Sequence, residues 1–301
     1  MAANQSSDSL FPSEGFFPVD QGALFYREIG HGQPVIILHG GPDFDHNYLL
    51  PDMDRLSNSF RLVYYDQRGR GKSVGVSNPD QVSIQSEIKD LERLREHLKL
   101  ESFVTLGHSW GGLLGMEYAI RHPNRVSHLL LVNTCPVSHD DFMLFRQELH
   151  LKRTPTEIEK MRALSAATRY EEGDLELDAE FNRIHFRPAG YRPEQLERVI
   201  KNLRVGMTPG GVRRSRVIED QLYDETWRSS DYNLLPMLKK LNIPTLVIHG
   251  DHDFIPVECA VHIAQAISSS RFVLLKECGH FSYMESPDEF YKEVSNFIQS
   301  H

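Results

Sequence analysis

Residues 107–112 read Gly107-His108-Ser109-Trp110-Gly111-Gly112, and they stand where a strand-like run gives way to a helix-like run. Residues 103–106 before them are apolar and partly β-branched, which is typical of a buried strand. Residues 113–120 after them have the composition of a mostly buried helix. A serine between two glycines at such a junction sits in a strained turn that exposes its hydroxyl. The pattern favours Ser109 as a nucleophile, and the alternative is a glycine-rich turn between strand and helix without a chemical role.

Other short apolar runs predict the rest of a mostly parallel sheet. They cover residues 23–29, 34–38 and 61–65 before the serine turn, and residues 128–132, 245–248 and 271–275 after it. Helix-length segments separate these runs, as a parallel sheet covered by helices on both faces requires. Two of those segments, residues 84–98 and 288–298, have the apolar spacing or the capping signals of surface helices. We therefore expect an α/β fold.

The rhythm of strands and helices is interrupted once. Residues 135–240 contain no clear buried strand, several helical stretches and equal numbers of acidic and basic residues. We expect this segment to form a helical cap over the carboxyl-terminal edge of the sheet, where open α/β folds have their sites. The core then comprises residues 15–134 and 241–301, preceded by a flexible tail, residues 1–14.

Composition narrows the classes of function. The net charge is −9 and no basic tract occurs, so the sequence does not favour nucleic acid as a partner. No apolar stretch reaches the roughly 18 residues of a membrane span, and the polar N-terminus lacks the regions of a signal peptide. We expect a cytoplasmic protein that binds neither nucleic acid nor membrane.

The three cysteines, Cys135, Cys259 and Cys278, are far apart in the sequence. Neither a disulfide framework nor a zinc ligand pattern is present in their spacing. We expect buried free thiols and no metal site.

A nucleophilic serine needs a base and an acid that orients the base, and candidates for both follow predicted strands. His280 follows the last strand, whereas Asp251 and Asp253 follow the strand before it. Structural alternatives exist for each, since His280 is one of 15 histidines and aspartates commonly begin loops. The chain order Ser, Asp, His is the order of α/β-hydrolases, which favours the catalytic interpretation.

Stabilisation of an oxyanion needs two backbone N–H groups. The residue after the serine, Trp110, provides one. The loop His39-Gly40-Gly41-Pro42, directly after the strand at residues 34–38, provides the other, which we assign to Gly41. Glycines at this place let the backbone approach a substrate oxygen, and His39 and Gly40 are candidate substrate contacts.

Three motifs resemble those of the proline iminopeptidase group of α/β-hydrolases. They are His39-Gly40-Gly41-Pro42, Asp66-Gln67-Arg68-Gly69-Arg70-Gly71-Lys72-Ser73 and the serine turn, within a resemblance that covers roughly residues 15–300. The resemblance implies an α/β-hydrolase fold with an inserted cap and no cofactor. It also favours Asp253 over Asp251, because the acid of that superfamily usually lies three residues after the strand-end glycine.

The sequence departs from the family pattern where substrates are selected. Asp43 occupies a position at which the family usually has glycine, and Phe254 occupies one at which some members have a glutamate that binds the substrate amine. An ammonium group in a pocket needs carboxylate partners. Asp43, Glu219, Asp220 or the acidic run at residues 171–176 are candidates, although such charges more often lie on solvated helix faces.

We expect a serine hydrolase with an acyl-enzyme intermediate, acting on a small molecule or short peptide. Release of an N-terminal proline is the sharpest form of this expectation. The alternatives are a carboxylesterase, a lactonase or another amide hydrolase, and, from a different class, a non-catalytic ligand sensor built on the same fold.

Overall fold

The computed structural model describes residues 11–73, 78 and 81–300. Their central feature is a sheet of eight strands in the order β1-β2-β4-β3-β5-β6-β7-β8. The strands are β1 (Ser13–Val19), β2 (Gly22–Ile29), β3 (Pro34–Leu38), β4 (Arg61–Tyr65), β5 (Phe103–His108), β6 (Val126–Val132), β7 (Thr245–Gly250) and β8 (Ser270–Leu275). Strands β3 to β8 pair in parallel with one another, and β1 and β2 add an antiparallel edge next to β4.

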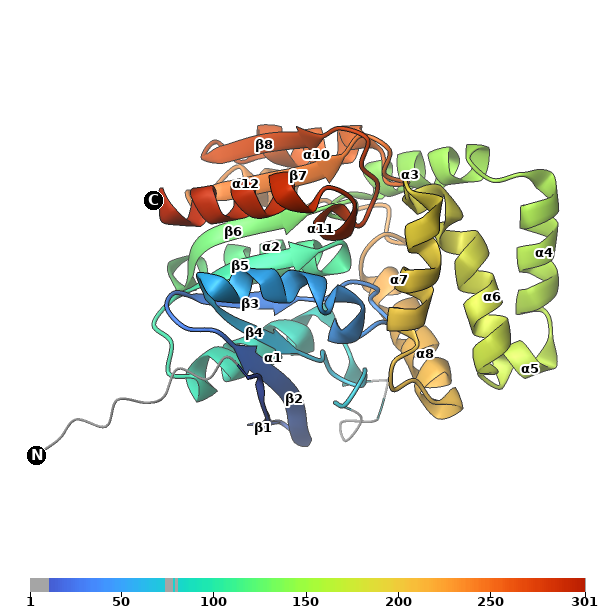
Figure 1. Cartoon of the computed structure of the whole chain (residues 1–301), viewed down its shortest axis with the longest axis horizontal. Coiled ribbons are helices and arrows are strands. Elements are labelled where there is room, and N and C mark those ends of the chain that lie inside the picture. The colour runs from blue at the N-terminus through green and yellow to red at the C-terminus, as the bar shows by residue number, and fades with distance from the viewer. Residues whose placement is uncertain (1–10, 74–77, 79–80, 301) are drawn as a thin grey trace, which may run out of the picture.

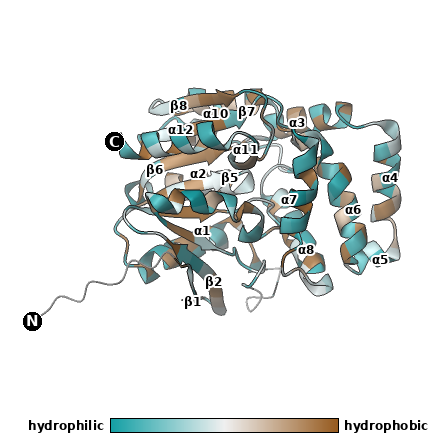
Figure 2. Ribbon diagram, viewed as in Figure 1, coloured by the Kyte–Doolittle hydropathy of each residue, from teal (hydrophilic) through white to brown (hydrophobic). Residues whose placement is uncertain are grey.

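Burial explains why the central strands carry continuous apolar runs. Every residue of β5 and of β7 is buried, because helices cover both faces of the sheet. Helix α12 (Pro287–Gln299) lies in front of the sheet in the view of Figure 1, and α1 (Ile84–His97) lies behind it. Figure 2 shows the hydrophobic colour of β6 against the mixed colouring of these helices.

The other helices of the core join these two layers. Helix α2 (Trp110–Arg121) contacts α1 and β5, and α10 (Val257–Ala266) contacts β7 and β8. The short helices η2 (Asp52–Asn58) and α11 (Ser282–Glu285) contact each other and α12. Because the strands are parallel, the residues that follow β3, β5, β6, β7 and β8 all meet at one edge of the sheet.

Helices fill the chain between β6 and β7. They are α3 (His139–Leu151), α4 (Pro155–Ser165), α5 (Thr168–Glu171), α6 (Leu175–Phe186), α7 (Leu196–Leu203), α8 (Pro209–Glu225) and α9 (Leu235–Leu238). Helices α4 to α8 lie together beyond one end of the sheet (Figure 1). We call the residues from His139 to Glu225 the inserted helices.

The mostly parallel sheet predicted from the apolar runs is confirmed, and each of the seven predicted strands has a counterpart. Strand β1 was not predicted, because only its Phe17 is buried and its pattern of exposure is irregular. It begins at Ser13, two residues before the predicted start of the core. Residues 1–10 of the predicted tail lie outside the described residues. Among the described residues, no helix is long and apolar enough to span a membrane.

Candidate active site

Ser109 lies in the tight turn between β5 and α2. Its backbone has φ 54° and ψ −118°, and its N–H donates to Val132 O at 3.0 Å. The flanking glycines are required by space: a Cβ atom on Gly107 would lie 2.3 Å from Gly111 O, and one on Gly111 would lie 2.1 Å from Leu38 O. The turn thus places a strained serine at the edge of the sheet, directly before a helix N-terminus.

Asp253 and His280 are brought together by the loops that follow β7 and β8. His280 Nδ1 lies 3.0 Å from both carboxylate oxygens of Asp253. Asp253 also accepts hydrogen bonds from Ile255 N–H at 2.9 Å and from Asn133 Nδ2 at 2.8 Å. Burial opposes ionisation of Asp253, but the neighbouring His280 and His249 and these hydrogen bonds outweigh it and lower its pKa.

Asp251, the alternative acid, faces another way. Its carboxylate lies 2.7 Å from His252 Nδ1 and 3.6 Å from Lys276 Nζ. The same carboxylate accepts the Cys278 N–H at 3.3 Å, so it shapes the loop that carries His280. The structure therefore brings Asp253, and not Asp251, to the imidazole.

Ser109 and His280 line the same pocket. A carboxylate only accepts hydrogen bonds, so Asp253 assigns the proton to His280 Nδ1 and leaves Nε2 as an acceptor. Among the described contacts, none joins Ser109 Oγ to His280 Nε2, and such bonds often form only once substrate is bound.

Gly41 and Trp110, the predicted oxyanion donors, stand on either side of Ser109. Trp110 is the first residue of α2, so its N–H is at the positive end of the helix. Gly41 lines the pocket with φ +118°, and a Cβ atom there would lie 2.2 Å from Asp43 N. The N–H of the preceding Gly40 is occupied, since it donates to Tyr48 Oη at 2.8 Å.

His39 has a different place from the one expected. It is fully buried, its Nε2 accepts the Gln67 N–H at 3.0 Å, and its Nδ1 donates to Gly40 O at 2.9 Å. Burial, with the charge of Arg70, lowers its pKa to about 3, so the ring is neutral. His39 joins two of the sequence motifs, and neither His39 nor Gly40 is among the described residues that line the pocket.

The pocket above Ser109 has an aromatic part and an acidic part. It contains about 890 Å³ of space, including its opening to solvent, which suits a small amide or ester. The aromatic residues around His280 include Phe145, Phe186, Phe254 and Phe281. The Phe254 ring lies 4.7 Å from the His280 ring, so this aromatic part packs directly against the imidazole.

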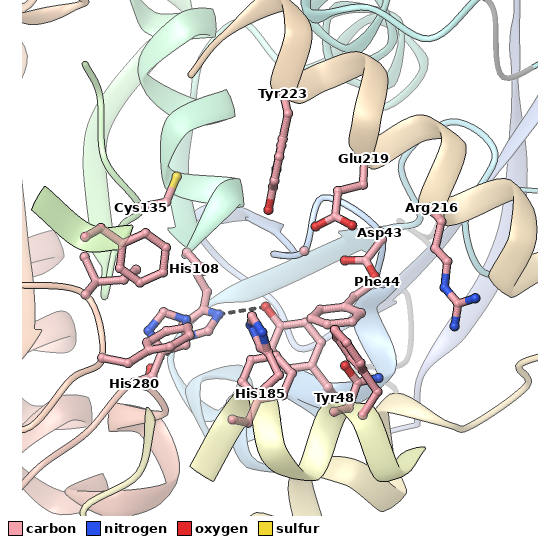
Figure 3. A pocket seen from close by; sticks show the side chains of 18 of the residues that line it. Asp43, Phe44, Tyr48, His108, Cys135, His185, Arg216, Glu219, Tyr223 and His280 are labelled. Atoms are coloured by element: carbon pink, nitrogen blue, oxygen red, sulfur yellow. Dashed lines mark hydrogen bonds between the residues drawn. The ribbon is translucent and has the colours of Figure 1, made fainter. Parts of the chain in front are cut away.

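Asp43 and Glu219 form the acidic part of the pocket. Figure 3 shows their carboxylates turned toward each other, Asp43 from the loop after β3 and Glu219 from α8. Burial and then the charge of Glu219 raise the pKa of Asp43 well above its usual range. Burial also raises the pKa of Glu219, opposed by a hydrogen bond from Tyr223. Two carboxylates in one pocket make this part of the site a candidate to bind a cation.

The other predicted carboxylates lie elsewhere. Asp220 is exposed and pairs with Arg228 at 2.6 Å. In the acidic run at residues 171–176, Asp174 caps α6 by accepting from the N–H groups of Glu176 and Leu177. None of these is among the described pocket residues. The structure instead adds Asp178, which pairs with Arg216 at 2.5 Å in the pocket wall.

Asn133 and Tyr48 are further contributors to the site that were not predicted from the sequence. Asn133 follows β6 and holds Asp253 in place, and its φ of 46° is unusual for a residue other than glycine. Asn133 could have been found from the sequence by its position directly after a predicted strand. Tyr48, on η1 (His46–Leu49), lines the pocket without any motif to mark it.

The three cysteines are free and buried. One group of possible metal ligands, Asp45, His46 and Asp66, lies beside the pocket loop. Two of these residues bind each other: His46 Nδ1 lies 2.6 Å from Asp66 Oδ1, and the other Asp66 oxygen accepts Lys72 N–H at 2.8 Å. These contacts hold two loops together.

The fold and the position of Ser109 define a class of protein. Residues 33–287 match the family described as alpha/beta hydrolase fold, and the chain belongs to that family.

Particular members of the family resemble this chain over nearly its full length. A proline iminopeptidase of Lactobacillus helveticus is 29% identical over 96% of this chain and 98% of its own length. The crystal structure of a proline iminopeptidase from Mycobacterium smegmatis superposes with a TM-score of 0.70 at 22% identity, covering 96% of this chain and 98% of that one. A thermophilic esterase from Thermogutta terrifontis gives 0.69 at 22% identity, with the same shares covered. These two structures show the shared fold.

Proposed function

We propose that this protein is a serine hydrolase that releases an N-terminal residue with a free amino group, such as proline, from small peptides or amides. The observation that carries the proposal is the position of Asp43 and Glu219 in the same pocket as Ser109 and His280. In this proposal, the two carboxylates bind the ammonium group of the substrate's N-terminal residue. Ser109 then attacks the carbonyl carbon of that same substrate residue. The similarity to proline iminopeptidases supports this choice of substrate.

The proposed reaction assigns a step to each of the polar groups around Ser109. His280 Nε2 takes the proton of Ser109 Oγ as the oxygen attacks the acyl carbon, and Asp253 holds the imidazolium. The N–H groups of Gly41 and Trp110 stabilise the oxyanion. His280 then returns the proton to the leaving amine. Water, activated by the same imidazole, cleaves the acyl-enzyme.

The inserted helices act as a cap in this proposal. Residues 135–240, which include the inserted helices, supply Glu219 and most of the aromatic side chains of the pocket, whereas the core supplies the reacting groups. A substrate is therefore enclosed between the two parts. This arrangement favours a small molecule or short peptide over a folded protein.

A carboxylesterase or lactonase is the second candidate. The observation in its favour is Phe254, which presents an aromatic ring where an amine-binding glutamate stands in some relatives. An uncharged acyl group would fit this aromatic part of the pocket without using the acidic part. The esterase among the similar structures has the same fold.

Four substrates separate these candidates. Turnover of proline arylamide, alanine arylamide, N-blocked proline arylamide and p-nitrophenyl acetate is measured on one preparation. We expect the free proline amide to be cleaved at least about tenfold more efficiently than its blocked form, because blocking removes the ammonium.

Equal rates on the free and blocked amides, with faster ester cleavage, would contradict the aminopeptidase proposal and favour the esterase. A chain that cleaves none of the four and does not react with a fluorophosphonate would be a ligand sensor.

A further inference from the structure

A line of buried hydrogen bonds joins the oxyanion loop to the catalytic base. Gly40 N–H donates to Tyr48 Oη at 2.8 Å, and Tyr48 Oη lies 2.7 Å from His108 Nδ1. His108 Nε2 lies 2.9 Å from the backbone carbonyl of His280. Tyr48 and His108 are each at most 2% exposed. Figure 3 shows the bond between their side chains at the floor of the pocket.

The direction of every bond in this line follows from chemistry. A carbonyl only accepts, so His108 Nε2 carries a proton. Burial, with the charge of His280, lowers the pKa of His108 to about 3, so its Nδ1 carries none. Tyr48 must therefore donate its hydroxyl proton to Nδ1, and its oxygen accepts from Gly40. Each donor faces one acceptor, so the line has a single arrangement.

One end of this line fixes the peptide of the base. The His280 carbonyl accepts from His108, and the His280 N–H donates to Ala189 O at 2.6 Å. Both backbone polar groups of His280 are thus engaged. Since Asp253 binds the ring at Nδ1, the only remaining ring nitrogen is the Nε2 that serves Ser109.

The other end fixes the oxyanion loop. Gly40 N–H is bound to Tyr48, and Gly40 O accepts from His39. The peptide that follows, with the Gly41 N–H, is therefore held in one orientation. His108 is also the residue directly before Ser109. The same hydrogen bonds therefore connect the oxyanion loop, the nucleophile and the catalytic base.

Aromatic packing prevents His108 from turning. Its ring lies 4.8 Å from the His280 ring, stacks on Phe281 at 5.8 Å and meets the edge of Tyr283 at 5.5 Å. With both nitrogens engaged, this histidine does not compete with His280 for the serine proton, although it is the nearer of the two in sequence.

We propose that Tyr48 and His108 are positioning residues for the hydrolysis. They hold the oxyanion donor, the Gly41 N–H, and the catalytic base, His280, at fixed positions relative to Ser109. The inference rests on the proposed function as a serine hydrolase but not on the identity of the substrate. Displacements below 1 Å in such a site reduce rates strongly, so the bonds matter to turnover more than to binding.

The test compares Tyr48→Phe, His108→Asn and the double variant by a mutant cycle on p-nitrophenyl acetate. Tyr48→Phe removes both bonds of the hydroxyl. In His108→Asn, the new amide oxygen replaces Nδ1, so the bond from Tyr48 remains and the bond to His280 is lost. Tyr118→Phe is the control, since it removes a buried hydroxyl that donates to Glu92, away from the pocket.

We expect each single variant to lower kcat by about 10- to 100-fold, with KM changed less than about threefold. The fold-loss of kcat in the double variant should be smaller than the product of the two single fold-losses. The rate of fluorophosphonate labelling of Ser109 falls in parallel, and Tyr118→Phe changes only the melting temperature. If Tyr48→Phe does not fold, the comparison of kcat and KM between His108→Asn and the wild type is sufficient for the test.

Wild-type kcat in both single variants, or losses that multiply independently, would overturn the positioning role. A wild-type protein that cleaves the ester but not proline arylamide would overturn the aminopeptidase proposal and leave this test intact. A wild-type protein that neither labels nor turns over any ester would overturn both.

Discussion

Ser109, which directly precedes α2, and Glu219 on α8 both line the pocket, yet the two helices are held in place differently. In α2, which begins directly after Ser109, 10 of 12 residues are buried. In α8, which carries Glu219, three of 17 residues are buried. The first helix is packed on nearly all sides, whereas the second is mostly solvent-exposed or half-buried. On the proposed function, the core determines the reaction, and the inserted helices select its substrate.

The largest effect that this comparison predicts is at Ser109. Ser109→Ala should lower kcat by at least about 10³-fold on amides and esters alike, because the nucleophile serves every substrate. The melting temperature should stay near that of the wild type, since alanine occupies less space in the same turn. Steady-state turnover and thermal unfolding monitored by circular dichroism measure both.

Residual activity near the wild-type level on any of these substrates would remove Ser109 from the mechanism.

Packing in the core predicts the next effect. Gly111→Ala places a methyl group 2.1 Å from the Leu38 carbonyl, so backbone atoms must move. We expect a loss of about 3 kcal/mol in the free energy of unfolding and a loss of activity on all substrates. Urea unfolding at 25 °C measures the first.

Gly210→Ala on α8 is the matched control. The nearest atom to its new methyl group is Arg213 Nη2 at 3.8 Å, so stability should be unchanged or slightly raised. Equal losses in the two variants would mean that α8 is as tightly constrained as α2.

A change on α8 should affect some substrates and spare others. Glu219→Gln keeps the shape of the side chain and removes its charge. We expect kcat/KM for proline arylamide to fall by about 10- to 100-fold and that for p-nitrophenyl acetate to stay within about twofold. Asp224→Asn is the control, because Asp224 lies on the same helix and pairs with Arg228.

Equal losses on the amide and the ester in Glu219→Gln would show that Glu219 supports the structure of the pocket and does not select an amine.

The pH dependence of binding provides a smaller test of the same site. The pKa of Asp43 and that of Glu219 are raised, so the carboxyl groups of the empty pocket remain protonated to higher pH than free carboxyl groups. A protonated pair binds an ammonium poorly. We therefore expect KM for proline arylamide to fall by about tenfold as pH rises through these raised values, while KM for the ester stays constant.

A KM for proline arylamide that does not change with pH, in wild type and in Glu219→Gln alike, would contradict a titrating acidic pair.

The smallest effect is expected on α4, in which no residue is buried. Lys160→Ala removes an exposed ion pair with Glu180 at 2.5 Å. Exposed pairs contribute about 0–1 kcal/mol, so stability and both activities should be nearly unchanged. A change in substrate preference here would show that the outer layer of the inserted helices also controls access to the pocket.

The sequence allowed most of the core to be predicted, and the comparison of α2 with α8 explains why. Where strands are buried on both faces, as β5 and β7 are, apolar runs mark their bounds within a few residues. Residues at the strand ends, including Ser109 and His280, could be found by the same rule. The edge strand β1 could not, because it buries little and leaves no periodic pattern.

The pocket could be predicted only in part, because several of its residues come from helices with no sequence motif. Asp43 stood out as a departure within a motif, but Glu219 was one of several acidic candidates on apparently solvated helix faces. Its selection over Asp220 depends on which side of α8 faces the core. The same limit applies to Tyr48, whose role depends on a contact with His108 that is 60 positions distant in the sequence.

Chemical labelling of the reactive serine tests directly whether Ser109 is the nucleophile. Wild-type protein is treated with a fluorophosphonate, digested and mapped by mass spectrometry, with His280→Ala treated in parallel. We expect a stoichiometric adduct on Ser109 in the wild type and a rate of labelling at least about 10²-fold lower in His280→Ala. An adduct on another residue, or equal labelling of the two proteins, would contradict this assignment.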